Sequence, residues 1–324
     1  MKLKKILIPV IAVGLLIAGG VFLWNTSLFG KALPKMDYAP ALPAGLPNEQ
    51  PAGPGAQAAA DGLVPVCGGP AQMIVLILGI DENEQADAIR LARVDFINQK
   101  VTVLSIPRDF YVPIPGFSEH DILQNRINAA YGFGEYFKTE GGGVAAVART
   151  IYANWGVAPD HYLVFHFDHF GRVIDKIGGV DITLEKAVFG VGGNPYFGEG
   201  KHHLTGETAL SFIRIRETDT DIQRIDRQTL VLTETLKKLR DTRDVNQLVE
   251  LGTEMVRDKS ILTDVNFKNM YTLACLGKMM DSENVVFSSI PAELYTPFTT
   301  DLGANVRIPG PEVAPFIQGV MYGD

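Results

Sequence analysis

The chain has 324 residues, of which 46% are hydrophobic and 20% are charged, and its formal net charge is −8. This composition excludes a wholly disordered chain, a collagen-like fibre and a polytopic membrane protein, and it allows a large core in one or two domains. The acidic balance argues against a nucleic-acid binder, which needs positive surface to neutralise phosphates. We therefore expect no nucleic-acid partner.

An uncharged apolar run, Ile6–Trp24, follows three lysines near the start of the chain. As a helix rising about 1.5 Å per residue, the run would span roughly 28 Å, close to the hydrocarbon thickness of a bilayer. The lysines favour a cytoplasmic N-terminus, which places the rest of the chain outside the cell. We expect residues 1–30 to form a basic tail and one transmembrane helix in the cytoplasmic membrane; a cleaved signal peptide is the alternative.

Residues 31–71 are rich in proline, alanine and glycine and show neither helical nor strand periodicity. Composition of this kind is typical of a semi-extended linker. It predicts a stalk between the anchor and one extracellular domain at residues 72–324. Within that domain, residues 241–324 form either its end or a separate helical extension.

Periodicity after the stalk predicts alternating strands and helices. Strands are expected at 73–80, 92–97, 101–106, 162–167, 180–184 and 285–290, and helices at 143–155, 170–177, 205–210, 223–240, 245–256, 265–280 and 311–321. Asp264 is expected to cap the helix that begins at residue 265. This alternation predicts an α/β fold of three layers (α-β-α), with a central mixed sheet, helices on both faces and one transmembrane helix before it.

The strands at 92–97 and 101–106 are expected to form a hairpin. With a turn centred near Gln99, Arg90 would face Arg108. The open end of the hairpin would then gather three carboxylates beside the arginine, namely those of Asp81, Asp87 and Asp109. Carboxylates beside an arginine suit a hard cation and a phosphate, and a rim of surface salt bridges is an equal alternative.

Four arginines fall within residues 214–227. Apolar residues alternate with arginines over residues 212–216, which predicts a strand that presents Arg214 and Arg216 on one face. On the helix that follows, three side chains would share a face, those of Arg224, Arg227 and Gln228. Arginines converging from two elements suit a diphosphate, while the acidic residues in the same stretch allow a self-neutralised surface cluster instead.

Other polar features have weaker implications. The histidines lack the spacing of a zinc site. Gly141-Gly142-Gly143 precedes a helix and forms either a phosphate cradle or a turn. Cys67 and Cys275 would face an oxidising exterior, where they form one disulfide or stay as two thiols.

Several segments follow one another in a specific order: Leu78–Asp81, Val101–Asp109, Ile127–Tyr131, 165–182 and 200–210, then the arginines and Gln228. Together they resemble the LytR-CpsA-Psr cell-wall proteins. The resemblance implies a membrane-anchored phosphotransferase that moves a glycopolymer from a polyprenyl-diphosphate carrier to peptidoglycan through a phosphodiester. Teichoic acids and capsular polysaccharides are the usual cargo, and the lipid lies in an apolar tunnel between the sheet and the helices.

The resemblance also implies roles for individual residues. It places Asp87 at a Mg²⁺ ion and assigns the diphosphate to five residues: Arg108, Arg214, Arg216, Arg224 and Gln228. Arg227 joins them on the same helix face. Asp81 is a second candidate ligand for the metal, and either Asp81 or Asp109 would orient a metal-bound water or take the acceptor's proton.

One position departs from the family pattern. The family usually has an arginine two residues before the metal-side aspartate, where this chain has Gln85. The lost charge would lower activity unless Arg90 or Arg93 compensates. Two other functions therefore stay open: a non-catalytic polyprenyl-phosphate-binding or regulatory protein, and a polyprenyl-diphosphate diphosphatase.

Overall fold

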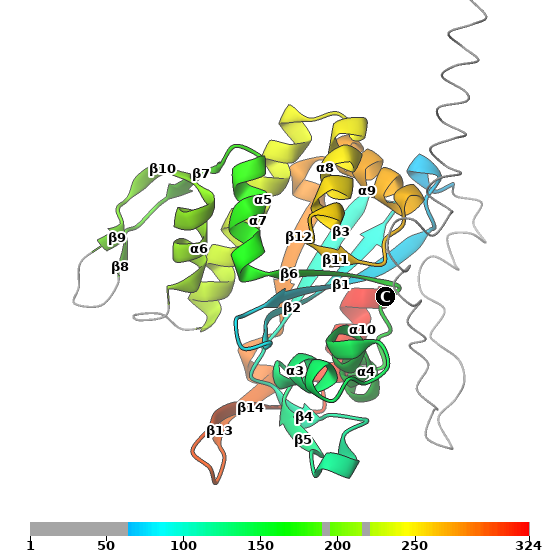
Figure 1. The fold of residues 1–324 in the computed structure, drawn as a ribbon, viewed down its shortest axis with the longest axis vertical. Helices are drawn as coiled ribbons and strands as arrows, with labels where there is room; N and C mark the ends of the chain where they lie inside the picture. Colours follow the sequence, from blue (N-terminus) through cyan, green and yellow to red (C-terminus); the bar gives the residue numbers. More distant parts are fainter. Residues whose placement is uncertain (1–63, 190–194, 216–220, 324) are drawn as a thin grey trace, which may run out of the picture. The chain divides into compact units, whose positions relative to one another are not determined.

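The fold is built on a mixed β-sheet, shown by a computed structural model that describes residues 64–189, 195–215 and 221–323 (Figure 1). Within these ranges the sheet has six strands in the order β11-β6-β1-β2-β3-β12. Their bounds are β1 (Gln72–Ile80), β2 (Ala86–Asp95), β3 (Lys100–Ile106), β6 (His161–His166), β11 (Leu262–Thr263) and β12 (Val285–Ser289). Strands β1, β2 and β3 are antiparallel, whereas β6 joins β1 and β12 joins β3 in parallel.

Helices cover both faces of this sheet (Figure 1). One face carries α3 (Ala129–Tyr136), α4 (Gly142–Trp155) and α10 (Val313–Tyr322). The other carries α5 (Phe167–Lys176), α6 (Gly206–Arg214), α7 (Asp221–Thr242), α8 (Val245–Arg257) and α9 (Phe267–Met279). The predicted three-layer α-β-α arrangement with a mixed sheet is therefore confirmed.

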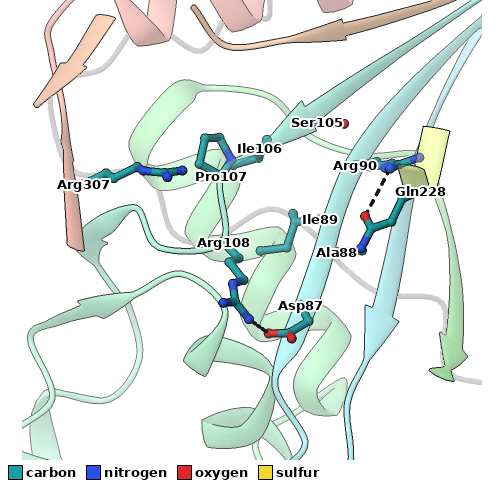
Figure 2. A pocket seen from close by; sticks show the side chains of 10 residues that line it. All are labelled: Asp87, Ala88, Ile89, Arg90, Ser105, Ile106, Pro107, Arg108, Gln228 and Arg307. Atoms are coloured by element: carbon teal, nitrogen blue, oxygen red, sulfur yellow. Dashed lines mark hydrogen bonds and ion pairs between the residues drawn. The ribbon is translucent and has the colours of Figure 1, made fainter. Parts of the chain in front are cut away.

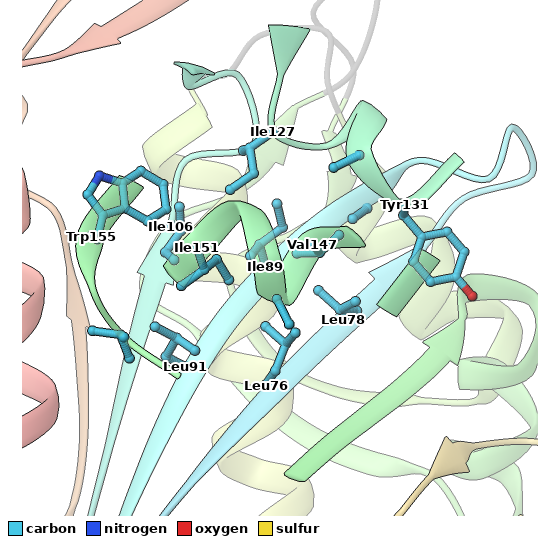
Figure 3. Packing of buried hydrophobic residues seen from close by; sticks show 14 of the residues in the cluster. Leu76, Leu78, Ile89, Leu91, Ile106, Ile127, Tyr131, Val147, Ile151 and Trp155 are labelled. Atoms are coloured by element: carbon cyan, nitrogen blue, oxygen red, sulfur yellow. The ribbon is translucent and has the colours of Figure 1, made fainter. Parts of the chain in front are cut away.

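The central strand β1 is apolar along its length because both of its faces are covered. Leu76 and Leu78 pack into the core beneath α4 and α10, while Met73 and Val75 pack into the core beneath α9. Figure 3 shows the first of these cores, where the side chains of α4 meet those of β1 and β2. Each large apolar side chain buried here contributes about 1.5–3 kcal/mol.

The glycines before α4 allow two helices to approach closely. A Cβ atom on Gly143 would lie 2.6 Å from the carbonyl oxygen of Tyr131, and one on Gly134 would lie 2.5 Å from that of Gly142. The amide of Gly143 donates to Oε1 of Glu135 at 2.7 Å, so a carboxylate already occupies the N-terminus of α4. These glycines therefore serve packing of α3 on α4, not a phosphate cradle.

Four two-stranded sheets also occur in the described ranges. They pair β7 (Val180–Leu184) with β10 (Gly200–Leu204), β8 (Val188–Phe189) with β9 (Pro195–Phe197), β4 (Tyr111–Pro113) with β5 (Gln124–Arg126), and β13 (Tyr295–Thr299) with β14 (Asn305–Pro309). Most of these strands are too short to show a period in the sequence. One of them, β14, contributes to the pocket described below.

The hairpin of β2 and β3 forms as expected, but its register differs from the prediction. Asp95 pairs with Lys100 and Arg90 with Ser105, so Arg90 does not face Arg108. The turn comes earlier because the Asp95 carboxylate accepts hydrogen bonds from the amides of Ile97 and Asn98, at 3.0 and 2.8 Å.

Two local predictions were wrong. Residues 212–214 belong to helix α6, not to a strand, because Phe212 and Ile213 are both buried and lie on the same helix face as Ala209. Helix α9 is capped by Asn266, whose side chain accepts from the amide of Asn269, and not by Asp264. The carboxylate of Asp264 instead accepts from the amide of Tyr162 on β6.

A disulfide joins Cys67 to Cys275 and ties the start of the described chain to α9. Among the residues that the structure describes, no helix is both long and apolar enough to cross a membrane. The predicted anchor at residues 1–30 and the stalk before Val64 lie outside those residues.

Candidate functional site

A β-bulge at Asp87 reshapes the end of the hairpin. Ile80 pairs with Ala86 and Gly79 with Ala88, which leaves Asp87 as an extra residue in β2. Ala86 packs into the α4-side core, whereas Ala88 packs against the core of helices α5–α8. The extra residue shifts the alternation by one, so Ala86 and Ile89 face the same core although they lie three residues apart.

Asp87 meets Arg108 across the hairpin. The pairing of β2 with β3 ends at Ile89 and Ile106, and just beyond it Nη1 of Arg108 lies 2.5 Å from Oδ1 of Asp87. The side chains are 7% and 18% exposed for Asp87 and Arg108, so this ion pair is largely shielded from water. Shielding strengthens the attraction within the pair relative to an exposed salt bridge, and removal of either partner weakens the charge compensation of the other.

These side chains belong to a small pocket at the open end of the hairpin (Figure 2). Its lining residues are Asp87, Ala88, Ile89, Arg90, Ser105, Ile106, Pro107, Arg108, Gln228 and Arg307. The free space is about 20 Å³, on the order of one water molecule. The lining carries three guanidinium groups and one carboxylate, which favours an anionic ligand.

Helix α7 supplies Gln228 to this pocket. Its Oε1 accepts a hydrogen bond from Nη2 of Arg90 at 3.3 Å. Arg90 is only 6% exposed, and burial lowers the pKa of its guanidinium to about 10, so the side chain stays charged at neutral pH. The pair joins the hairpin to the helix layer.

Arg307 reaches the pocket from β14, far along the chain (Figure 2). Its amide donates to the carbonyl of Asp109 at 2.9 Å, and its guanidinium lies 5.5 Å from the ring centre of Tyr295. Sequence reasoning missed this residue because nothing in residues 305–309 distinguishes Arg307 from a surface arginine. Only the tertiary fold brings it to Arg108.

The other predicted carboxylates do not line the pocket. Asp81 accepts from the amides of Asn83 and Gln85, at 2.9 and 2.8 Å, and so holds the turn between β1 and β2. Asp109 lies between two arginines, 3.6 Å from Nε of Arg108 and 3.7 Å from Nη1 of Arg126. The predicted rim of three carboxylates therefore separates into one pocket residue and two neighbours.

The remaining predicted arginines occupy different surroundings. Arg214 ends helix α6, where its half-exposed side chain lies 4.0 Å from Glu82. Arg227 is buried and donates to the carbonyls of Phe212 and Ile215. Arg224 lies on α7 one turn before Gln228, but its side chain is outside the described part of the structure, as is the whole of Arg216.

Gln85, which stands where the family usually has arginine, is bound to a buried asparagine. Its Oε1 accepts from Nδ2 of Asn128 at 2.9 Å, and Asn128 is only 1% exposed. The backbone of Asn128 accepts from the amide of Ala86 and donates to the carbonyl of Arg108. Asn128 thus joins both strand ends that carry the Asp87–Arg108 pair, a role that sequence spacing did not indicate.

The residues present fit Mg²⁺ in a limited way. Asp87 offers a carboxylate to the pocket, and Mg²⁺ is commonly held by one or two carboxylates together with substrate phosphates. Asp81 fits less well because its carboxylate is engaged by two backbone amides. Across the described ranges, no cluster of three or more histidine, cysteine, aspartate or glutamate side chains is arranged to hold a metal.

Comparison of the sequence with known proteins identifies a family that it matches. The model of the LytR_cpsA_psr family matches residues 69–307. Regulatory protein MsrR of Staphylococcus aureus is 33% identical over 174 residues, which cover 51% of this chain and 48% of MsrR. A protein of Oceanobacillus iheyensis named polyisoprenyl-teichoic acid–peptidoglycan teichoic acid transferase TagU is 30% identical over 205 residues, 61% of each chain. The chain thus spans about half the length of MsrR.

Solved structures show the same fold. TagV of B. subtilis superposes with a TM-score of 0.62 at 21% identity, over 77% of this chain and 97% of TagV. TagT bound to LIIa-WTA superposes with a TM-score of 0.59 at 22% identity, over 78% of this chain and 91% of TagT.

Proposed function

The chain belongs to the LytR_cpsA_psr family, and we propose that it transfers a glycopolymer from a polyprenyl-diphosphate carrier to peptidoglycan. The observation that carries this proposal is the pocket whose lining contains the guanidinium groups of Arg90, Arg108 and Arg307 and the carboxylate of Asp87. Guanidinium groups bind phosphate oxygens bidentately, and fixed positive charge is the main source of catalysis in phosphoryl transfer. The similarity to a protein named as a teichoic acid transferase agrees with such a substrate.

The reaction requires the formation of one bond and the cleavage of another. A hydroxyl oxygen of the acceptor sugar attacks the phosphorus next to the glycopolymer, the bond from that phosphorus to the bridging oxygen breaks, and polyprenyl phosphate leaves. Arg108 and Arg214, with Arg216 and Arg224, would stabilise the charge that develops on the phosphate oxygens. Asp109, which follows Arg108 and contacts it, is our candidate to take the hydroxyl proton.

We infer that substrate binding widens the pocket, because its free space of about 20 Å³ is on the order of one water molecule while Arg108 is paired with Asp87. We propose that the diphosphate replaces Asp87 as the partner of Arg108. The released carboxylate would then hold Mg²⁺, which when bound would neutralise charge on the diphosphate oxygens.

We further propose the placement that the N-terminal sequence predicts. The apolar run Ile6–Trp24 would anchor the chain in the cytoplasmic membrane, and the proline-rich stalk would hold the domain outside the cell, near a lipid-linked substrate and the peptidoglycan acceptor. Capsular polysaccharide and teichoic acid are both candidate cargoes.

One assay separates the proposed function from its alternatives. The full chain is incubated with a labelled lipid-linked glycan, Mg²⁺ and peptidoglycan fragments, and the label is followed. Label coupled to peptidoglycan supports transfer, a water-soluble phosphorylated glycan indicates a diphosphatase, and bound but unchanged lipid indicates a binding or regulatory protein.

Arg108→Ala is the matching variant. We expect it to lower transfer by about 10²–10³-fold, because one fixed positive charge at the reacting phosphate is lost. Arg108→Lys keeps the charge and controls for the loss of the ion pair with Asp87, while Arg93→Ala removes an arginine of β2 that does not line the pocket. Wild-type transfer by Arg108→Ala would contradict the assignment.

A further inference from the structure

Arg90 is a buried cation in the lining of the pocket. Its exposure is 6%, and among the described residues no carboxylate lies within ion-pair distance of its guanidinium. Among the described residues, its hydrogen-bond partner is Gln228, whose Oε1 lies 3.3 Å from Nη2 of Arg90. Buried charges in proteins are normally paired, because taking an isolated ion out of water is expensive. A guanidinium that lines a pocket and meets no carboxylate among the described residues therefore points to an anionic ligand.

The charges of the whole pocket support this interpretation. Its lining contains the guanidinium groups of Arg90, Arg108 and Arg307 and the carboxylate of Asp87. Arg108 already neutralises Asp87 at 2.5 Å, so the carboxylate provides nothing for Arg90. Arg90 therefore adds positive charge to the lining at the point where β2 meets Gln228 of α7 (Figure 2).

We propose that Arg90, oriented by Gln228, is a further oxyanion-binding residue of this pocket and holds one phosphate of the substrate's diphosphate. The assignment rests on the proposed function and adds a residue to its site. Gln228 fits this arrangement because its amide oxygen accepts from Arg90, which leaves its amide NH₂ group to donate to the same phosphate.

The alternation of β2 explains why Arg90 belongs to this site. Ala88 packs against the core of helices α5–α8 and Ile89 into the α4-side core, so Arg90 lies with Ala88 on the face of β2 that meets α7. Arg93 lies three residues further along β2, on the opposite face from Arg90, and is not among the residues that line the pocket. It is the matched control, since it is the same residue type on the same strand.

The test measures diphosphate binding by the full chain. The probes are inorganic pyrophosphate and geranylgeranyl diphosphate, with inorganic phosphate for comparison, titrated calorimetrically at low salt. For Arg90→Met we expect the Kd for both diphosphates to rise at least tenfold, which corresponds to about 1.4 kcal/mol. The Kd of Arg90→Lys should lie between those of the wild type and Arg90→Met, because lysine keeps the charge without the planar fork. The Kd of Arg93→Met should stay within twofold of the wild-type value.

A stability control accompanies these titrations. Methionine fills a buried site without leaving a charge, so Arg90→Met should unfold at a temperature close to that of the wild type. If Arg90→Met does not fold, the Arg90→Lys titration decides, and wild-type affinity in that variant together with unchanged salt dependence overturns the proposal.

The remaining outcomes are distinct. If Arg90→Met binds both diphosphates like the wild type while Arg108→Ala loses binding, the assignment of Arg90 is overturned and the proposed function stands. If Arg90→Met and Arg93→Met weaken binding equally, the effect is one of general charge and the assignment is also overturned. If the wild-type chain binds neither diphosphate, Arg90 and the proposed function fail together.

Discussion

Replacement of Arg227 by methionine is expected to lower the stability of the fold and to leave diphosphate binding largely intact. The sequence groups Arg227 with the diphosphate residues, but the structure buries it to 7% exposure. Its Nε donates to the carbonyl of Phe212 at 3.1 Å and its Nη2 to the carbonyl of Ile215 at 2.6 Å. These carbonyls end helix α6, where a cation also interacts favourably with the helix dipole.

The size of the effect follows from these two bonds. A hydrogen bond to a charged group contributes about 1.5–3 kcal/mol, so the loss of both lowers the free energy of unfolding by about 3 kcal/mol or more. For a domain of this size, 1 kcal/mol corresponds to about 2–4 °C in Tm. Arg227→Met should therefore unfold about 6–12 °C below the wild type.

Thermal unfolding of the full chain, followed by circular dichroism, measures this difference. Arg240→Met is the matched control on the same helix, because Arg240 makes a surface pair with the adjacent Asp241 at 2.8 Å and should change Tm little. Pyrophosphate titration below the unfolding temperature provides the second readout, with a Kd within about threefold of the wild type. A wild-type Tm together with lost pyrophosphate binding would refute this reasoning and return Arg227 to the ligand site.

Two further predictions concern stability. The Cys67–Cys275 disulfide spans 208 residues, and the chain-entropy relation gives about 5 kcal/mol for a loop of this length. Replacing both cysteines by serine should therefore lower the free energy of unfolding, measured in denaturant, by several kcal/mol. A loss below about 1 kcal/mol would contradict this prediction. The hydrogen bond and charge of Asp264 raise the pKa of His161, so this pair stabilises the fold fully below the unfolded pKa of about 6.5 and less as pH rises through the folded pKa. The difference in unfolding free energy between the wild type and Asp264→Asn should therefore shrink from pH 5.5 to pH 8.5, and a constant difference would exclude the pair as its source.

The fold could be predicted where the sequence has a clear period. The uninterrupted apolar run of β1 and the helical spacing of Val144, Val147, Ile151 and Trp155 both reflect elements that pack on large cores. The stretch at 212–216 was misread because alternating isoleucine and arginine fits a strand, whereas the capping box at Thr205 begins a helix that continues through Arg214. The helix forms despite this local alternation because it buries both Phe212 and Ile213.

The site was predicted less completely, for two physical reasons. The hairpin register depends on the Asp95 carboxylate, which closes the turn early and moves Arg90 opposite Ser105. Arg307 comes from a short strand whose contact with the segment after Arg108 exists only in the folded chain. By contrast, Asp87 and Arg108 were expected at one end of the hairpin, and there they form an ion pair.

The bulge at Asp87 also explains why Gln85 need not act as a phosphate ligand. Strict alternation would direct Asp87 into the α4-side core with Ile89, where an unpaired carboxylate is costly. Asn128 holds the bulge by accepting from the amide of Ala86 and donating to the carbonyl of Arg108, and its own side chain donates to Gln85. Gln85 thus supports the geometry of the strand ends, while the positive charge of the pocket comes from Arg90, Arg108 and Arg307. Gln85 and Arg90 therefore belong to different parts of the same site: Gln85 supports the geometry of the strand ends, and Arg90, by our proposal, binds the anion.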